Sequence, residues 1–250
     1  MIYKDELLKD NYSFEQAEKV QVKYQKIIQN STHNTIVKSI QSIETVVGVD
    51  VAYFTKDNAE FGIAAAVLWN VHQERVEFEC GFKGSINFPY KAGFLGFREC
   101  KLLAQTILNL PFKPNLIMCD GHGKIHPRRF GEAVQLGLAL DIPSIGVAKN
   151  PYIGDYKLKD FKRCKGYKTP IWGKNQNFDS MNTINELLGY SVCLNNGSKP
   201  VYISEGYNIL IDVALEICLA TTKGHRQPEP LYLADQLSKT KIKKCSQELK

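Results

Sequence analysis

Apolar and polar positions alternate in short blocks along the first half of the chain. Residues 45–52 form a β-branched run, which predicts a buried strand. Residues 61–69 and 75–82 are two further strand candidates, and the gap between them is short enough for a hairpin. Three consecutive strands of this kind predict an antiparallel meander.

The pattern then changes to helical spacing. Residues 94–110 carry apolar side chains three and four positions apart and end at prolines, so we expect a helix. A short apolar run at 116–119, a helix at about 130–140 and a short strand at 144–148 follow. Strand–helix–strand order implies a parallel crossover, so the whole pattern predicts a mixed α/β sheet.

The flanking segments give weaker patterns. Residues 13–30 are predicted to be helical, with Ser13 and Gln16 spaced as a capping box. Region 150–199 is rich in Lys, Asn, Gly and Tyr and is hard to assign. The remaining elements are strands near 169–173, 189–194 and 200–204, and helices at 209–222 and from about 231.

Composition places the chain among ordinary globular proteins. Hydrophobic residues make up 44% and charged residues 23% of its 250 residues, enough for a substantial core. There is no internal repeat or clear boundary, so we expect a single domain over 1–250. Its core would span about 40–240, with a basic, solvated tail at about 239–250. The net charge of +6 permits a polyanionic partner without requiring one.

The sequence also bears on the cellular location. It has no apolar signal core at the N-terminus and no apolar run long enough to cross a bilayer. Its seven cysteines are scattered without a Cys-x-x-Cys pair, which favours a reducing compartment over a disulfide framework. We expect a cytoplasmic protein, or a nuclear one in a eukaryote, that is a monomer without a membrane or an obligate protein partner.

Segment 116–131 is the first candidate for chemistry. Its apolar run ends at Asp120, and glycines, two histidines and two arginines follow at once. Open α/β sheets place their sites at the carboxyl ends of strands, and Gly121 and Gly123 let the backbone approach a ligand closely. A charge at the end of a core strand is costly unless something pairs with it.

Four carboxylates stand in apolar surroundings. Asp50 interrupts a valine-rich strand, and Asp120 ends another. Glu99 lies on the apolar face of its helix, and Asp235 follows a short apolar run on the last helix. Any one of these alone is typical of a salt-bridged structural acid. However, the strands at 45 and 116 are expected side by side, with the helix of Glu99 leading into the second, so Asp50, Glu99 and Asp120 are predicted to converge.

Convergence of this kind points to metal-assisted chemistry. Like charges so close disfavour joint ionisation, and a divalent cation removes the conflict. Carboxylate oxygens without a cysteine or histidine cluster favour Mg²⁺ or Mn²⁺ over Zn²⁺, and paired metals typically support in-line attack on a phosphodiester. Lys149 would either neutralise a phosphate or be a surface lysine. His126 would either orient the attacking water, touch the phosphate, or be a satisfied loop residue.

These motifs resemble the endonuclease V family of deaminated-base endonucleases, from about residue 45 to 240. Two motifs are specific, namely 89–99 (PYKAGFLGFRE) and 120–129, which combines DGHG with HPRR. Weaker matches accompany them at 49–53 (VDVAY), 146–149 (GVAK), 228–230 (PEP) and 233–235 (LAD).

The resemblance implies a fold and an activity. The expected fold is α/β and ribonuclease H-like, a mixed five-stranded sheet flanked by helices with family-specific insertions. The implied reaction is metal-dependent hydrolysis of the second phosphodiester bond 3′ to inosine or deoxyinosine in nucleic acid, with Mg²⁺, or Mn²⁺, as cofactor. The positions that match the family's metal-site acids are Asp50, Glu99, Asp120 and Asp235. Lys149 and His126 match positions assigned to the phosphate and to the water or lesion pocket.

The resemblance also implies how a lesion is held. Segment Pro89-Tyr90-Lys91-Ala92 matches the family's wedge, where the ring of Tyr90 would replace the stacking partner of a base turned out of the helix. Gly93, Leu95 and Gly121 match pocket positions around that base.

The chain departs from the family pattern at a few positions. Ala92 stands where a second proline is usual, Gln135 where a histidine is usual, and Tyr207 follows Gly206 where Gly-His is common. Residues 155–185 align poorly. Two other readings stay open: a related two-metal nuclease with another structural target, and a catalytically silent inosine-binding protein.

Overall fold

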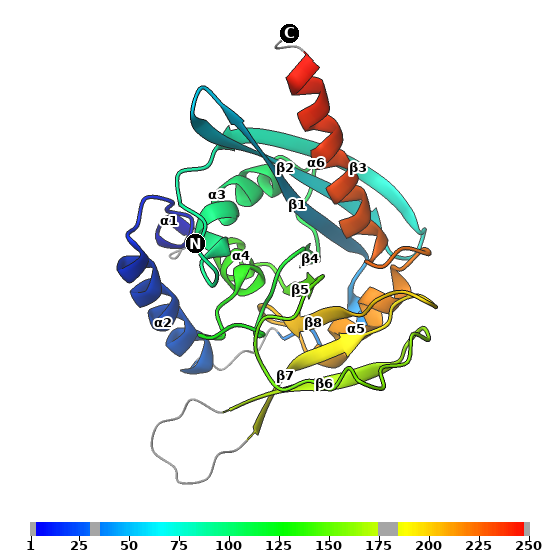
Figure 1. Cartoon of the computed structure of the whole chain (residues 1–250). Helices are drawn as coiled ribbons and strands as arrows, with labels where there is room; N and C mark the ends of the chain where they lie inside the picture. The colour runs from blue at the N-terminus through cyan, green and yellow to red at the C-terminus, as the bar shows by residue number, and fades with distance from the viewer. Residues whose placement is uncertain (1–3, 31–35, 175–184, 248–250) are drawn as a thin grey trace.

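The sheet is the centre of the structure. The computed structural model describes residues 4–30, 36–174 and 185–247, with side chains to Lys244. In this part of the chain eight strands form one sheet in the order β3-β2-β1-β4-β5-β8-β7-β6 (Figure 1). The strands are β1 Thr45–Lys56, β2 Ala59–Asn70, β3 Arg75–Ser85, β4 Leu116–Cys119, β5 Ser144–Ala148, β6 Lys168–Lys174, β7 Asn185–Val192 and β8 Val201–Glu205.

The predicted mixed α/β sheet is confirmed, but the expectation of five strands was wrong. β1, β2 and β3 form the antiparallel meander, and β4 and β5 pair in parallel beside β1. β8 then adds antiparallel to β5, and the β6–β7 pair continues the sheet from β8. The sequence pattern predicted these three strands individually. Their attachment depends on long-range pairing, which hydrophobic periodicity does not report.

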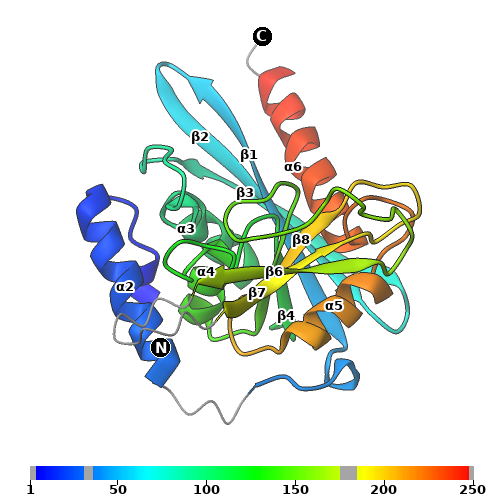
Figure 2. The ribbon, with the colours of Figure 1, turned by 60° about the horizontal axis from the view of Figure 1, so that its bottom comes forward.

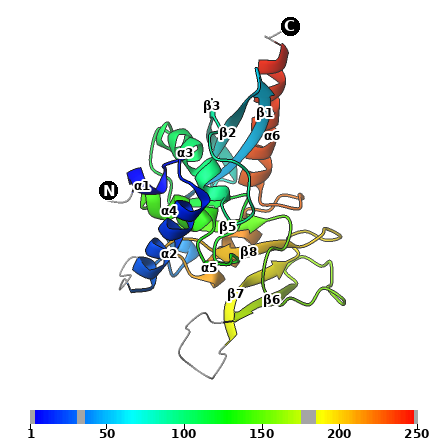
Figure 3. The same cartoon turned by 60° about the vertical axis from the view of Figure 1, so that its left-hand side comes forward.

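Helices cover both faces of the sheet. They are α1 Lys4–Leu7, α2 Phe14–Asn30, α3 Leu95–Leu108, α4 Glu132–Leu140, α5 Ile211–Ala220 and α6 Glu229–Gln247, with a 3₁₀ turn at Ile40–Ser42. α3 and α4 pack on one face, and α2 lies outside them, as Figure 2 shows. α5 packs on the other face under β5 and β8, and α6 crosses β1 and β2 (Figure 3).

Alternation along β1 decides which side chains meet which helices. Val47, Val49 and Val51 belong to the core under α3 and α4, whereas Val46 belongs to the core on the opposite face. Since side chains alternate with period two in a strand, Gly48 and Asp50 share the face of Val46, where α6 lies. A Cβ on Gly48 would come 2.2 Å from the backbone carbon of Pro230. Glycine at this position therefore lets the start of α6 cross directly over β1.

Two terminal elements test local predictions. Ser13 Oγ accepts from Gln16 N at 3.2 Å and Gln16 Oε1 accepts from Ser13 N at 2.9 Å, so the capping box at the start of α2 is confirmed. Residues 239–247 of the predicted basic tail continue α6, and Lys239, Lys243 and Lys244 on it are exposed. Across the described ranges, none of the helices combines the length and apolarity that a membrane span needs.

Candidate active site

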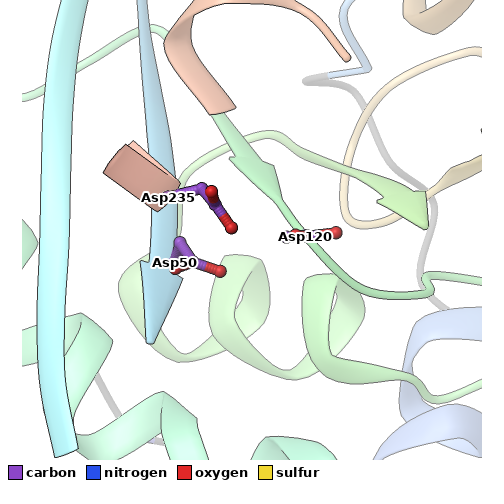
Figure 4. Close-up of side chains that lie close together, drawn as sticks. All are labelled: Asp50, Asp120 and Asp235. Carbon is purple, nitrogen blue, oxygen red and sulfur yellow. The ribbon is translucent and has the colours of Figure 1, made fainter. Parts of the chain in front are cut away.

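Three aspartates from distant parts of the sequence meet on one face of the sheet. β1 and β4 run in parallel with Val49 opposite Cys119, so Asp50 and Asp120 each follow by one residue and lie side by side. Asp235 reaches the same point from α6 (Figure 4). One carboxylate oxygen from each of the three lies within 4.8 Å of the other two.

Few groups compensate this negative charge. Lys149 Nζ, just after β5, lies 2.5 Å from Asp120 Oδ2 and 3.5 Å from Asp235 Oδ1. Ser238 Oγ donates to Asp50 Oδ2 at 2.7 Å, and Lys239 Nζ lies 2.6 Å from Asp235 Oδ2. Burial, followed by the charges of Asp120 and Asp235, raises the pKa of Asp50 despite the Ser238 hydrogen bond. A divalent cation suits this donor set, because three carboxylate oxygens converge as hard ligands. The cation would also favour the charged form of Asp50, which burial and the neighbouring aspartates disfavour.

Glu99 approaches the same region from the other face. Its helix α3 packs against the Val47 side of the sheet, and its side chain is 8% exposed. Tyr53 donates a hydrogen bond to Glu99 Oε1, and Glu132 at the start of α4 also interacts with its carboxylate. Burial is the largest cause that raises the pKa of Glu99 to about 7, and Asp50 and Asp120 add to it.

The structure therefore refines the predicted convergence. Asp50 and Asp120 come together as expected. Asp235, which only the family resemblance had assigned to the site, completes the group. Glu99 is a buried neighbour rather than a member of the close group, since it reaches the site from the α3 face of the sheet.

A cavity of about 200 Å³ opens beside the acids. It is lined by predicted site residues Tyr90, Lys91, Ala92, Gly93, Leu95 and His126, together with Gln21, Gly96, His122, Gly131, Glu132, Asn150, Pro151 and Tyr152. Tyr90 is 74% exposed, so its ring projects from the protein. Pro89 and Gly121 are not among the lining residues, but Gly121 lies against the wall, since a Cβ there would come 2.1 Å from Oε2 of the lining residue Glu132.

Gly93 is a fixed point of the cavity wall. Its φ of +87° belongs to the left-handed region that glycine tolerates, and a Cβ there would come 2.9 Å from the Tyr152 hydroxyl. Its carbonyl accepts hydrogen bonds at 3.0 Å each from Gln21 Nε2, Arg128 Nη2 and His126 Nε2. The cavity wall that faces Tyr152 is therefore formed by the backbone of Gly93, and three hydrogen bonds fix its position.

His126 is a satisfied loop residue. Burial lowers its pKa to about 3, so the ring is neutral near pH 7. Because Nε2 lies against the Gly93 carbonyl, it carries the proton, and Nδ1 accepts from the backbone N–H groups of Arg128 and Phe130. With both nitrogens engaged, the geometry favours a role in building the cavity over a role as a base.

Sequence reasoning missed Glu132 and His122. Glu132 is 4% exposed, and burial with the charge of Glu99 raises its pKa well above the usual range, which favours its protonated form. Glu132 is the one charged residue between Arg129 and Asp141 in the sequence. A single acid in an otherwise uncharged segment was a signal that could have identified it. His122 lines the cavity with a pKa lowered to about 4 by burial, and its Nδ1 has no partner in the described part of the chain.

The departures from the family pattern lie in different surroundings. Gln135 is fully buried, and its Nε2 donates to Leu7 O at 2.7 Å, which ties α4 to α1. Tyr207 lies at the far side of α4, with its hydroxyl donating to Asp141 Oδ1 at 3.1 Å. Ala92 lines the cavity. Part of the poorly aligned region, residues 175–184, lies outside the described residues.

A mixed sheet that brings aspartates from β1, the end of β4 and the last helix together, beside a lysine and near a cavity, defines a nuclease of the ribonuclease H-like fold. The family model for endonuclease V matches residues 24–236. Endonuclease V of Streptomyces avermitilis is 36% identical over 201 residues, which cover 80% of this chain and 82% of that protein. The chain therefore belongs to the endonuclease V family.

Solved structures agree with this assignment. Endonuclease V of Bacillus subtilis is similar with a TM-score of 0.82 at 25% identity, over 98% of each chain. Endonuclease V of Ciona intestinalis, in complex with a 24mer DNA containing an inosine followed by a ribo-adenosine, has a TM-score of 0.72 at 25% identity. That match covers 91% of this chain and 97% of the other.

Proposed function

We propose that this nuclease cleaves nucleic acid at inosine or deoxyinosine. It hydrolyses the second phosphodiester bond 3′ to the lesion and leaves a 3′-hydroxyl and a 5′-phosphate, with Mg²⁺ or Mn²⁺ as cofactor. The observation that carries the proposal is the meeting of Asp50, Asp120 and Asp235 within 4.8 Å, next to the cavity that Tyr90 borders. The inosine-containing DNA bound by the Ciona relative supports the same class of substrate.

Asp50, Asp120 and Asp235 would hold the divalent cation, and Glu99 would serve as a further acid from the α3 face. A cation bound there supplies an activated water and stabilises charge on the leaving oxygen. Lys149 holds its ammonium group against Asp120, and its pKa is raised because the charges of Asp120 and Asp235 outweigh the effect of burial. It therefore remains protonated and is positioned to neutralise the phosphate of the attacked bond.

The cavity would receive the base. Hypoxanthine differs from adenine in carrying a carbonyl at C6 and a proton on N1, so a matching wall needs an acceptor for N1 and a donor for O6. His122 Nδ1, which has no partner in the described part of the chain, is an acceptor among the lining residues. The carboxyl of Glu132 lines the same cavity and interacts with Glu99. Tyr90, exposed at the rim, would stack where the base has left the helix.

The test is cleavage of matched inosine-containing DNA and RNA oligonucleotides with Mg²⁺, Mn²⁺ or EDTA, with the cut position mapped. We expect cleavage one nucleotide beyond the inosine on its 3′ side, dependent on the cation and on Asp120. Cleavage that ignores inosine would indicate a nuclease with another structural target. Inosine binding without any cleavage would indicate a catalytically silent binding protein.

A further inference from the structure

A second hollow, a groove, includes the lysine of the active site in its wall and adjoins the base cavity. It has a volume of about 420 Å³ and is built from segment 149–163, from residues 199–202 and from Arg226. The base cavity is lined by Asn150, Pro151 and Tyr152, and this groove by Lys149 and Asn150, so the two hollows share Asn150 in their walls.

The backbone of the groove is held together by specific bonds. Arg226 Nη2 donates to Pro200 O at 2.7 Å and also to Lys149 O, which ties the loop before α6 to both walls. Gly197 N donates to Arg163 O at 2.8 Å, which joins the two loops that form the groove's outer end. The groove is therefore a built feature of the fold rather than a chance gap between loops.

The charge of the groove is one-sided. Five of its lining residues are cationic, namely Lys149, Lys159, Arg163, Lys199 and Arg226, and none is acidic. Lys159, Arg163 and Lys199 are exposed, and within the described ranges none of these three or Arg226 forms an ion pair. The aromatic rings of Phe161 and Tyr202 lie among them. Cations that face one groove without acidic partners, interleaved with aromatic rings, are the pattern of a surface that follows a nucleic-acid strand.

One other hollow of the molecule provides a comparison for this charge. Another hollow lies at the opposite ends of the strands, where β1 and β3 begin. It is lined by two cations, Arg75 and Lys113, and by two acids, Glu44 and Glu77. Its charges cancel, so the unbalanced positive charge is found where Lys149 meets the active site.

We propose that this basic groove binds the sugar–phosphate backbone of the cleaved strand on the 3′ side of the cut. The inference rests on the proposed function, since the direction follows from the base cavity holding the inosine and the bond 3′ to it lying at the three aspartates. A strand that passes from the cavity across Lys149 enters the groove next. The groove thus retains the product that carries the new 5′-phosphate.

The test combines charge removal with substrate length. The triple variant Lys159→Gln, Arg163→Gln, Lys199→Gln changes only exposed side chains and leaves the aspartates and Lys149 intact. Binding is measured in EDTA against inosine oligonucleotides that are long on both sides, short on the 3′ side or short on the 5′ side, over a range of salt concentrations. Arg75→Gln, Lys113→Gln, in the charge-balanced hollow, is the matched control.

We expect the triple variant to bind the long and the 5′-short oligonucleotides about tenfold or more weakly. Its slope of log affinity against log salt should be smaller by about 2, as the loss of three phosphate contacts on a single strand requires. The 3′-short oligonucleotide should bind the variant and the wild type equally, and the control variant should behave as wild type throughout. An equal loss on all three oligonucleotides, a loss that follows the 5′ side, or no loss would overturn the groove assignment. Because binding is read without cleavage, a failure of the cleavage assay remains distinguishable from a failure here.

Discussion

The sharpest consequence of the aspartate cluster concerns stability rather than activity. We predict that Asp50→Asn makes the metal-free protein more stable, although it removes a side chain proposed to be essential. Asparagine keeps nearly the same shape, and its carbonyl oxygen can still accept the hydrogen bond from Ser238. The change removes one of three carboxylates that crowd the site, whose mutual repulsion and burial raise the pKa of Asp50.

The magnitude follows from the geometry. Two unit charges 4.8 Å apart repel by about 3 kcal/mol at an effective dielectric constant of about 20. That dielectric constant suits this site, because the side chains of Asp120 and Asp235 are only 13% and 14% exposed. Asp50 takes part in two such pairs, and Lys149 offsets much of the repulsion. The free energy of unfolding of Asp50→Asn should therefore exceed that of wild type by about 1–2 kcal/mol. This corresponds to about 3–6 °C in melting temperature for a chain of this size.

The assay is thermal unfolding in EDTA and again with saturating Mg²⁺ or Mn²⁺. Wild type should melt higher with the cation, since a ligand at a hundred times its Kd adds about 2.7 kcal/mol. Asp50→Asn should start higher and lose most of this increment, whereas Glu216→Gln, an exposed acid on α5, should change neither value. A variant that melts no higher than wild type in EDTA, yet keeps the full cation response, would refute the proposal that these aspartates form a metal site.

Three further outcomes follow from the same geometry. Tyr90→Ala should reduce the preference for inosine over undamaged strands by about five- to hundredfold, the equivalent of one stacking contact, while Tyr90→Phe keeps it; competition binding measures this, and unchanged preference would remove the wedge assignment. Glu132→Gln should stay within a few degrees of the wild-type melting temperature, because an amide can still donate to Glu99. Glu132→Ala should lose about 2 kcal/mol by leaving a buried carboxylate without its partner, and equal melting of the two variants would contradict this. In EDTA, wild type should gain stability relative to Glu99→Gln as the pH falls from about 7 towards 4.5. The folded-state pKa of Glu99 is raised to about 7, so its charged form costs stability above that pH, and a pH-independent difference between urea midpoints would argue against this shift.

The sequence allowed the centre of this site to be predicted, for physical reasons. Val49 on β1 pairs with Cys119 on β4, and each of these apolar strands has an aspartate as its next residue, so Asp50 and Asp120 lie together. The alternation of side chains along β1 turns Asp50 towards α6. Glu99 was correctly predicted to be buried, but helical spacing does not tell from which face of the sheet a helix approaches. Glu132 was missed because the leucines of α4 dominated its pattern. The bonding of β6, β7 and β8 to the sheet depends on partners remote in the sequence, which no local pattern reports.

The contact between Ser238 and Asp50 joins positions 188 residues apart in the sequence. Bringing two such distant points together costs chain entropy that local pairing does not. The final helix offsets that cost by packing over β1 and β2, where Leu231 and Ala234 are buried. A chain that stops before this helix would therefore lose Asp235, the hydrogen bond from Ser238 to Asp50 and the cover over that face of the sheet.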